Sequence, residues 1–183
     1  MLQRIQSVWI LTAAIALAGA IDMRESYAQM RMSTQAGSSV SAPAGSGMAA
    51  GVQLGLVGAQ FGQRVHVVVP LGENYALRPA YVQTMASGAT FLLNGGGRLD
   101  LIGRTPILME LLRVYGIGGI QADYPFSPLG SGIGSLDYGI SGAFGSEFFI
   151  TPKFSYFFEI GGGGGFAKAG PFGSAIGGMN SYF

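Results

Sequence analysis

His66 supplies the only imidazole in the sequence, so any general-base chemistry would depend on it. A serine hydrolase needs a nucleophile beside the imidazole and an acid that orients the ring. His66 lies between two valines, and no serine follows two places on. Ser155 and Glu159 share one face of a predicted strand, but nothing in the spacing brings them to His66. We therefore predict no catalytic residue and interpret His66 as a hydrogen-bonded structural side chain.

The sequence also lacks the patterns that bind metals, nucleotides or nucleic acids. One histidine and no cysteine leave only scattered carboxylates, so we predict no metal site. The glycine runs at 95–97 and 161–165 are not followed by Gly-Lys-Ser/Thr, as a phosphate-binding loop would be. The net charge is +1 and the basic residues stand singly. We predict no cofactor and no nucleic-acid partner.

The charged residues that remain recur at alternate positions, a period typical of strands. Arg64 and His66 alternate with valines in 63–70, and Glu147 alternates with phenylalanine and isoleucine in 137–150. Glu159 alternates with Phe158 and Ile160 in the same manner. The charged side chains are therefore expected on one face of a sheet and the apolar side chains on the other.

Turn residues divide the second part of the chain into eight predicted strands. Short connections are expected at 72–74, 104–106 and 151–153, and they alternate with longer ones at 86–90, 127–136 and 168–171. The first two strands, near 51–60 and 62–71, are expected to be divided around 61–62, and the last strand covers 172–183. This pattern predicts an all-β fold of eight antiparallel strands.

The first part of the chain has the features of a secretory signal peptide. Arg4 precedes an uncharged apolar run of 13 residues from Val8 to Ala20, which is shorter than the roughly 20 residues of a membrane-spanning helix. Small residues permit cleavage after Ala20 or Ala28, and we favour Ala28. We predict three units: a signal peptide at 1–28, a flexible linker at 29–50, and a barrel at 51–183.

Two kinds of barrel fit the alternation. A secreted lipocalin-like barrel points its apolar face inward, whereas a transmembrane barrel points it toward lipid. Only 10% of the residues are charged, against about 25% in an ordinary soluble domain. Together with the signal peptide and the even strand count, this favours an up-and-down transmembrane barrel. Aromatic residues near the strand ends favour it too, among them Phe148, Phe149, Phe154, Tyr156, Tyr182 and Phe183.

The chain resembles the small bacterial outer-membrane barrels of the OmpA transmembrane-domain and OmpX kind. The resemblance rests on 139-GISGAFGSEFFITPKFSYFFEIGGG-163, a glycine-rich strand, a short turn and an aromatic strand, and on the hairpin at 69–81. The terminal Phe183 resembles the signal of such barrels, although Ser181 stands where an aromatic residue is expected. The resemblance implies a Gram-negative outer-membrane location, contact with outer-membrane lipid, insertion by the barrel-assembly machinery, and a monomer.

An eight-stranded barrel has an interior that side chains fill. We expect a lumenal polar network in which Glu147 and Glu159 pair with two or more arginines, because buried charges need partners. In the glycine run, Gly161 is expected to leave room in the lumen and Gly162 to expose bare backbone outside. The predicted network contains Arg64, His66, Arg78, Arg98, Asp100, Arg113, Glu147 and Glu159, with Gln53, Asn94, Gln121, Ser155 and Asn180 as further inward candidates.

The function predicted from these features is that of a non-enzymatic outer-membrane protein with a plugged lumen, serving envelope structure or surface interaction. Two alternatives remain open from the sequence. One is a barrel enzyme that acts on outer-membrane lipid, and the other is the secreted lipocalin-like barrel, which would bind a small apolar ligand.

Overall fold

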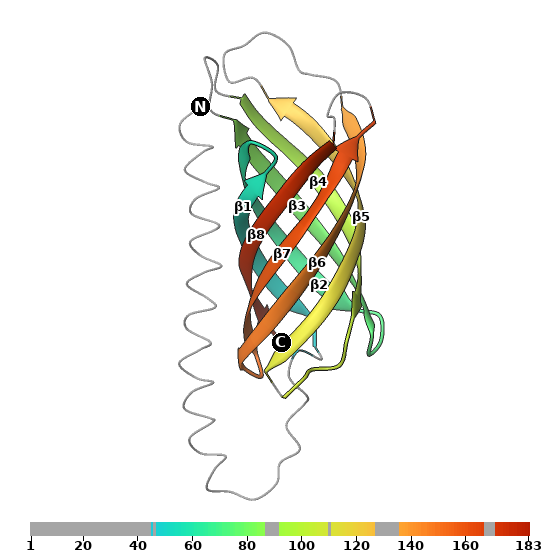
Figure 1. Ribbon diagram of the computed structural model, residues 1–183, viewed down its shortest axis with the longest axis vertical. Helices are drawn as coiled ribbons and strands as arrows, with labels where there is room; N and C mark the ends of the chain where they lie inside the picture. Colours follow the sequence, from blue (N-terminus) through green and yellow to red (C-terminus); the bar gives the residue numbers. More distant parts are fainter. Residues whose placement is uncertain (1–44, 46, 87–91, 110, 127–135, 167–170) are drawn as a thin grey trace, which may run out of the picture.

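The computed structural model is a closed barrel of eight strands (Figure 1). Each strand is antiparallel to its neighbours, and β1 closes the barrel by pairing with β8. The structure describes residues 45, 47–86, 92–109, 111–126, 136–166 and 171–183. The strands are β1 (Ala49–Val57), β2 (Gln60–Pro70), β3 (Tyr75–Ala86), β4 (Leu92–Arg104), β5 (Leu112–Phe126), β6 (Asp137–Thr151), β7 (Phe154–Gly165) and β8 (Pro171–Tyr182).

The number of strands and their antiparallel order confirm the predicted fold, but some boundaries were wrong. The first hairpin turns at 58–59 and not around 61–62. Gly58 has φ 60°, a conformation that glycine adopts without steric cost, and Leu56 pairs with Phe61 across the turn. β4 continues through Arg104, which the sequence analysis assigned to a connection. The predicted signal peptide lies outside the described residues.

The two ends of the barrel differ in their connections. At the lower end of Figure 1 lie the C-terminus and the connections at 71–74, 105–111 and 152–153. The strand ends that flank the other four connections lie at the upper end. Part of the predicted linker is placed at the lower end: the amide of Gly45 donates to the carbonyl of Pro152, and Phe183 donates to Met48. The barrel therefore begins at Ala49, with residues 45, 47 and 48 packed against its lower end.

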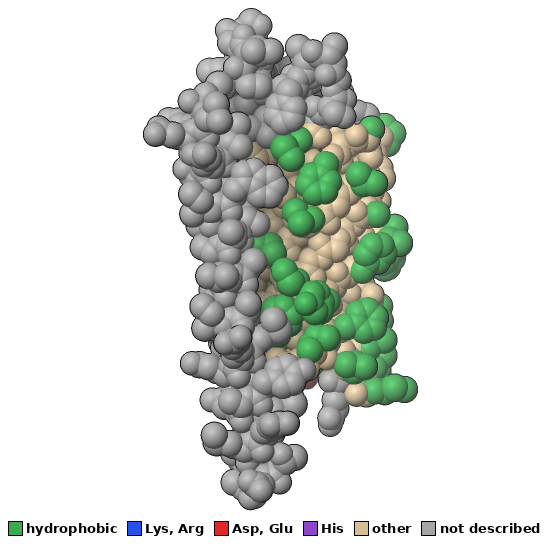
Figure 2. Space-filling model, turned by 90° about the vertical axis from the view of Figure 1, so that its left-hand side faces the viewer, with side chains coloured by type: hydrophobic (Ala, Val, Ile, Leu, Met, Phe, Trp, Pro, Cys, Tyr) green, Lys and Arg blue, Asp and Glu red, His purple; other side chains and the backbone are tan. Residues whose placement is uncertain are grey.

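The two faces of the barrel wall have opposite polarity. Every charged residue of the eight strands stands at an inward position, whereas the outward rows carry large apolar side chains such as Phe144, Ile160 and Ile120. Figure 2 shows one side of this outer surface, with apolar side chains separated by uncharged surface. The outward amides of Gln63 and Gln83 hydrogen-bond to each other. The lipocalin-like alternative, which needs an apolar interior, is therefore wrong.

The run of five glycines belongs to β7 and remains in the sheet along its whole length. Gly165 pairs with Gly139 of β6, and the amide of Phe166 still donates to the carbonyl of Tyr138. A side chain at Gly161 would collide with Gly142 and Ala143 of β6. The expectation that Gly161 leaves lumenal room was therefore wrong, because this glycine permits close approach of two strands.

No helix in the described part of the chain has the length and apolar character needed to cross a membrane.

Candidate functional site in the barrel lumen

The central cluster of the lumen is organised around the guanidinium of Arg78, on β3. Its Nη2 donates to Asp100 Oδ2 at 2.8 Å, and its Nη1 donates to Glu159 Oε1 at 2.5 Å. Asp100 lies on the neighbouring strand β4, directly opposite Arg78, whereas Glu159 reaches it from β7 across the lumen. The phenol of Tyr115 adds a hydrogen bond of 3.0 Å to Glu159 Oε1. All four side chains are buried.

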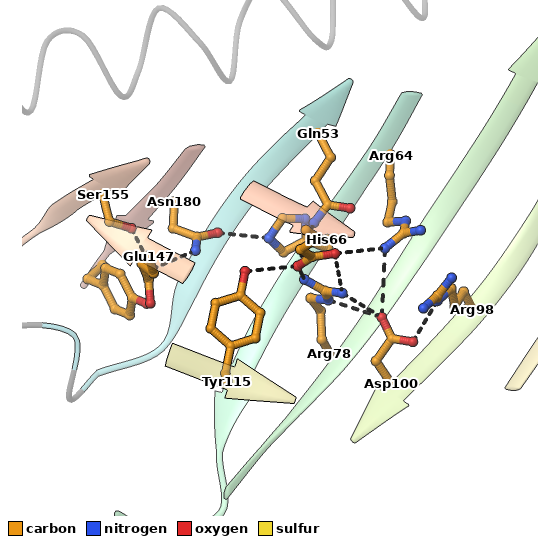
Figure 3. A network of polar contacts seen from close by, with 12 residues as sticks. Gln53, Arg64, His66, Arg78, Arg98, Asp100, Tyr115, Glu147, Ser155 and Asn180 are labelled. Atoms are coloured by element: carbon orange, nitrogen blue, oxygen red, sulfur yellow. Dashed lines mark hydrogen bonds and ion pairs between the residues drawn. The ribbon is translucent and has the colours of Figure 1, made fainter. Parts of the chain in front are cut away.

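Two further arginines complete the central cluster (Figure 3). Arg98 Nε donates to Asp100 Oδ1 at 2.5 Å. Arg64 Nη1 lies 3.8 Å from Asp100 Oδ2 and 4.0 Å from Glu159 Oε2, which is close enough for an ion pair and too far for a hydrogen bond. The central cluster thus holds three guanidinium groups and two carboxylates.

A second cluster, which we call the lower cluster, surrounds the carboxylate of Glu147. Its Oε1 accepts hydrogen bonds from Ser155 Oγ at 2.5 Å, Tyr182 OH at 2.6 Å and Asn180 Nδ2 at 2.8 Å. Its Oε2 lies 3.5 Å from Arg113 Nη1, at the limit of a hydrogen bond. Neutral donors therefore supply most of the contacts that Glu147 makes.

Arg113 has two other contacts that hold it at the lower end. Its guanidinium carbon lies 5.1 Å from the centre of the Phe149 ring, a cation–π geometry. Both of its Nη atoms are 3.4 Å from the carbonyl oxygen of Gly45. The segment before β1 is thereby tied to the lower cluster.

His66 lies between the two clusters. Its Nε2 is 2.8 Å from Asn180 Oδ1, and the amide of Asn180 in turn donates to Glu147. The ring also meets Phe157 edge to face, with 5.7 Å between centroids. Gly51 allows this arrangement, because a side chain at that position would collide with both His66 and Asn180. The imidazole is thus held by an amide and an aromatic ring.

The structure places all eight residues of the predicted network inside the barrel, in two groups rather than one. The central cluster contains Arg64, Arg78, Arg98, Asp100 and Glu159. The lower cluster contains Arg113 and Glu147, and His66 is attached to it through Asn180. Of the further inward candidates, Gln53 donates to Glu159 at 3.4 Å. Ser155 and Asn180 contact Glu147, while Asn94 and Gln121 lie nearer the upper end.

Several inward residues are absent from the predicted lumenal network. The prediction contains four arginines and three acids, whereas the described strands carry five of each, because Arg104, Asp123 and Asp137 also face inward. The alternation that starts at Asp100 and Arg113 would have found Arg104 and Asp123. Tyr115 and Tyr182 were missed because tyrosine side chains are mostly apolar, although each stands two residues from an inward polar residue, Arg113 or Asn180, and therefore on the inward face.

The chemistry that this arrangement supports is the neutralisation of buried charge. Ser155 donates to Glu147 and His66 bonds to Asn180, so each potential catalytic group is engaged with a different partner. Within the described residues, no three side chains of His, Asp or Glu gather in a way that could hold a metal ion. The lumen is best described as a packed polar core.

No protein-family model and no curated protein sequence matches the chain. Solved structures nevertheless share its fold. The N-terminal β-barrel domain of Pseudomonas aeruginosa OprF is 16% identical with a TM-score of 0.55, over 73% of this chain and 96% of that one. Neisserial surface protein A, NspA, is 12% identical with a TM-score of 0.62, over 74% and 96%. The outer membrane enzyme PagL is 10% identical with a TM-score of 0.51, over 74% and 99%.

These comparisons confirm the fold-level resemblance: the chain has the fold of the small eight-stranded outer-membrane barrels. Together with the apolar outer rows, they support a location in the bacterial outer membrane. The neighbours include a surface protein and an enzyme, so the shared fold leaves the role to be argued from the lumen itself.

Proposed function

We propose that this protein is a non-enzymatic barrel of the outer membrane whose lumen is closed by a polar network, and that it serves envelope structure or surface interaction. The observation that carries the proposal is that two buried polar clusters fill the lumen between Ser155 and Arg98 (Figure 3). Their members are nearly inaccessible to solvent: Ser155 and Asp100 are 0% exposed, and Arg78 is 2% exposed.

A network of this kind resists opening. Separating Arg78 from its two carboxylates would leave a buried guanidinium without its partners and remove the main cation from Glu159, which is costly by several kcal/mol. A general pore needs a continuous aqueous path, and the central and lower clusters occupy the place where that path would run. The barrel is therefore expected to be a rigid structural protein of the membrane and not a channel.

The outer surface fits contact with outer-membrane lipid. Its exposed side chains include Leu56, Tyr81, Leu101, Ile140 and Phe158, and no described strand presents a charge outward. With all eight strands paired in a closed ring, no strand edge remains for another chain to extend. These features support a monomer surrounded by lipid, which the barrel-assembly machinery would insert.

The test combines location and conductance. After expression of the full chain in a Gram-negative host, we expect recovery in the outer-membrane fraction and a shift in gel mobility on heating, as closed barrels show. In planar bilayers, the purified protein should give no stable conductance above the baseline. Recovery in the soluble fraction would contradict the location, and a long-lived open channel would contradict the plugged lumen.

The enzymatic alternative has its own test. PagL shows that this fold can carry an enzyme, so incubation with outer-membrane lipid followed by mass spectrometry is informative. We expect the lipid to be unchanged. If products form, and His66→Ala abolishes them while Asn94→Ala does not, the protein is an enzyme and the proposal is wrong.

A further inference from the structure

The upper half of the lumen, which we call the vestibule, has inward side chains that are more accessible to solvent than those below, and the central cluster lies beneath it. Inward side chains of the lower half, such as Gln53, Asp100 and Tyr115, are buried. Inward side chains above them are partly accessible to solvent, and this accessible set contains Thr84, Asn94, Gln121, Asp123 and Ser174. A small solute entering from the upper end would therefore stop at the central cluster.

Within the central cluster, which forms the floor of this vestibule, positive charges outnumber negative ones, although Asp123 above it also attracts Arg64 and Arg98. Asp100 and Glu159 carry two negative charges against the three guanidinium groups of Arg64, Arg78 and Arg98. Arg78 alone forms hydrogen bonds to both carboxylates, and Arg98 takes the remaining oxygen of Asp100. The third guanidinium, that of Arg64, is left with ion pairs at 3.8 and 4.0 Å.

Arg64 is the least satisfied group of the central cluster. Only 5% of it is exposed, yet its Nε and Nη1 have no hydrogen-bond partner within the described part of the chain. A buried guanidinium without hydrogen bonds is unfavourable, and arginine N–H groups bind halides and carboxylates well. Gln53 stands opposite Arg64 in the register of β1 and β2, but its Oε1 accepts no hydrogen bond from Arg64.

We propose that the vestibule floor binds a small monovalent anion, a halide or a short carboxylate, at the guanidinium of Arg64. The site goes beyond a plugged barrel and does not depend on which envelope role the barrel serves. Arg98 contributes a second positive charge, because it contacts the same carboxylate as Arg64. The anion would bring the charge of the central cluster to zero.

The surroundings of Arg64 favour an anion that is small and carries a single charge. Gly62 lies two residues above it on β2, and a side chain there would press against Val57 and Thr84 at 3.2 and 3.4 Å. The space is therefore narrow. Nearer the upper end, Asp123 and Asp137 stand directly opposite each other on β5 and β6. Their negative charges disfavour the entry of dianions more than that of monoanions.

The experiment uses the full chain refolded in detergent, with chloride and formate as probes and gluconate as a bulky reference at equal ionic strength. We expect the midpoint of heat unfolding to rise saturably with chloride or formate, and sulfate to act only weakly. Broadening of the chloride NMR line by the protein gives an independent readout. In Arg64→Gln, the affinity should fall by about tenfold or more, since the anion loses its main donor.

Two variants make the result specific. Arg104→Gln removes the same charge from the lower end and should keep the wild-type anion dependence. Val82→Asp places a carboxylate opposite Arg64 on β3, so it should raise the unfolding midpoint in gluconate and abolish the effect of chloride. This variant tests the site even if Arg64→Gln fails to fold.

The proposal is overturned if the wild type shows no saturable anion dependence, because water and the upper acids would then satisfy Arg64. It is also overturned if all variants respond equally, since that is general screening. A conducting channel would contradict the plugged lumen without affecting saturable binding, so the two proposals fail separately.

Discussion

The central cluster and the lower cluster hold buried charge in different ways. In the central cluster the hub is a cation, Arg78, which forms hydrogen bonds to two carboxylates. In the lower cluster the hub is an anion, Glu147, and its shortest contacts come from a serine, a tyrosine and an asparagine. The first is held by full charges and the second mainly by neutral dipoles. The two clusters should therefore respond differently to the loss of one member.

The largest effect is expected from removing the central hub. Arg78→Met leaves Asp100 and Glu159, both buried, without their main partner. Loss of one member of a buried ion pair typically costs about 3–5 kcal/mol. The measurement is the free energy of unfolding in urea for the protein in lipid vesicles, with the folded fraction read from its mobility on a gel. Arg113→Met is the matched control, and an equal loss in both variants would remove the distinction between the clusters.

The next comparison neutralises one acid in each cluster without changing its shape. Glu159→Gln leaves three guanidinium groups around one carboxylate, whereas Glu147→Gln leaves one arginine and an amide oxygen that can still accept hydrogen bonds. We expect losses of about 3 kcal/mol for Glu159→Gln and about 1.5–2 kcal/mol for Glu147→Gln. Urea unfolding gives both values, and the reverse order would contradict the assignment of hubs.

A matched pair of tyrosines separates the two kinds of hydrogen bond. Tyr182→Phe removes one of the three neutral donors to Glu147. Tyr115→Phe removes one donor to Glu159, but Glu159 still accepts hydrogen bonds from Arg78. We expect a loss of about 1.5 kcal/mol in the first and about 0.5–1 kcal/mol in the second. Double-mutant cycles with Glu147→Gln and Glu159→Gln check the coupling. Equal coupling energies would show that neutral donors matter alike in both clusters.

The smallest effect is expected for Arg98→Gln. Arg98 gives Asp100 a short contact, but it also adds to a surplus of positive charge beside Arg64. The lost attraction and the relieved repulsion should nearly cancel, so the change in unfolding free energy should stay within about 1 kcal/mol. A loss as large as that of Arg78→Met would mean that the central cluster has no charge surplus.

Much of the lumen was predictable because the side-chain period of a strand is two. Once Glu159 and Arg64 were assigned to one face, their neighbours along each strand followed, and the eight residues of the predicted network all lie inside. The prediction was weaker at the strand ends. Arg104 was assigned to a turn because Thr105 and Pro106 follow it, although the pairing of β4 with β5 extends to Arg104.

Contacts between neighbouring strands were also within reach of the sequence. Arg113 and Glu147 stand directly opposite each other in the register of β5 and β6, and Arg78 and Asp100 do so in β3 and β4. The apolar alternation limits such a register to shifts of two residues, but both of these hairpins have longer connections, which leave the exact register open. The aromatic residues near the lower end were harder to assign: Phe148 and Tyr156 face outward, whereas Phe149 and Tyr182 pack together inside.

The sequence by itself determined the number of strands, the face of most charged side chains and the polarity of the wall, because these depend on turn residues and on a period of two along the chain. The tertiary structure alone decided which charges meet across the lumen. Arg78 reaches Glu159 from a strand that is not its neighbour, and the residues are 81 positions apart. The closure and stagger of the barrel set that contact, and with it the split into two clusters and the incomplete pairing of Arg64.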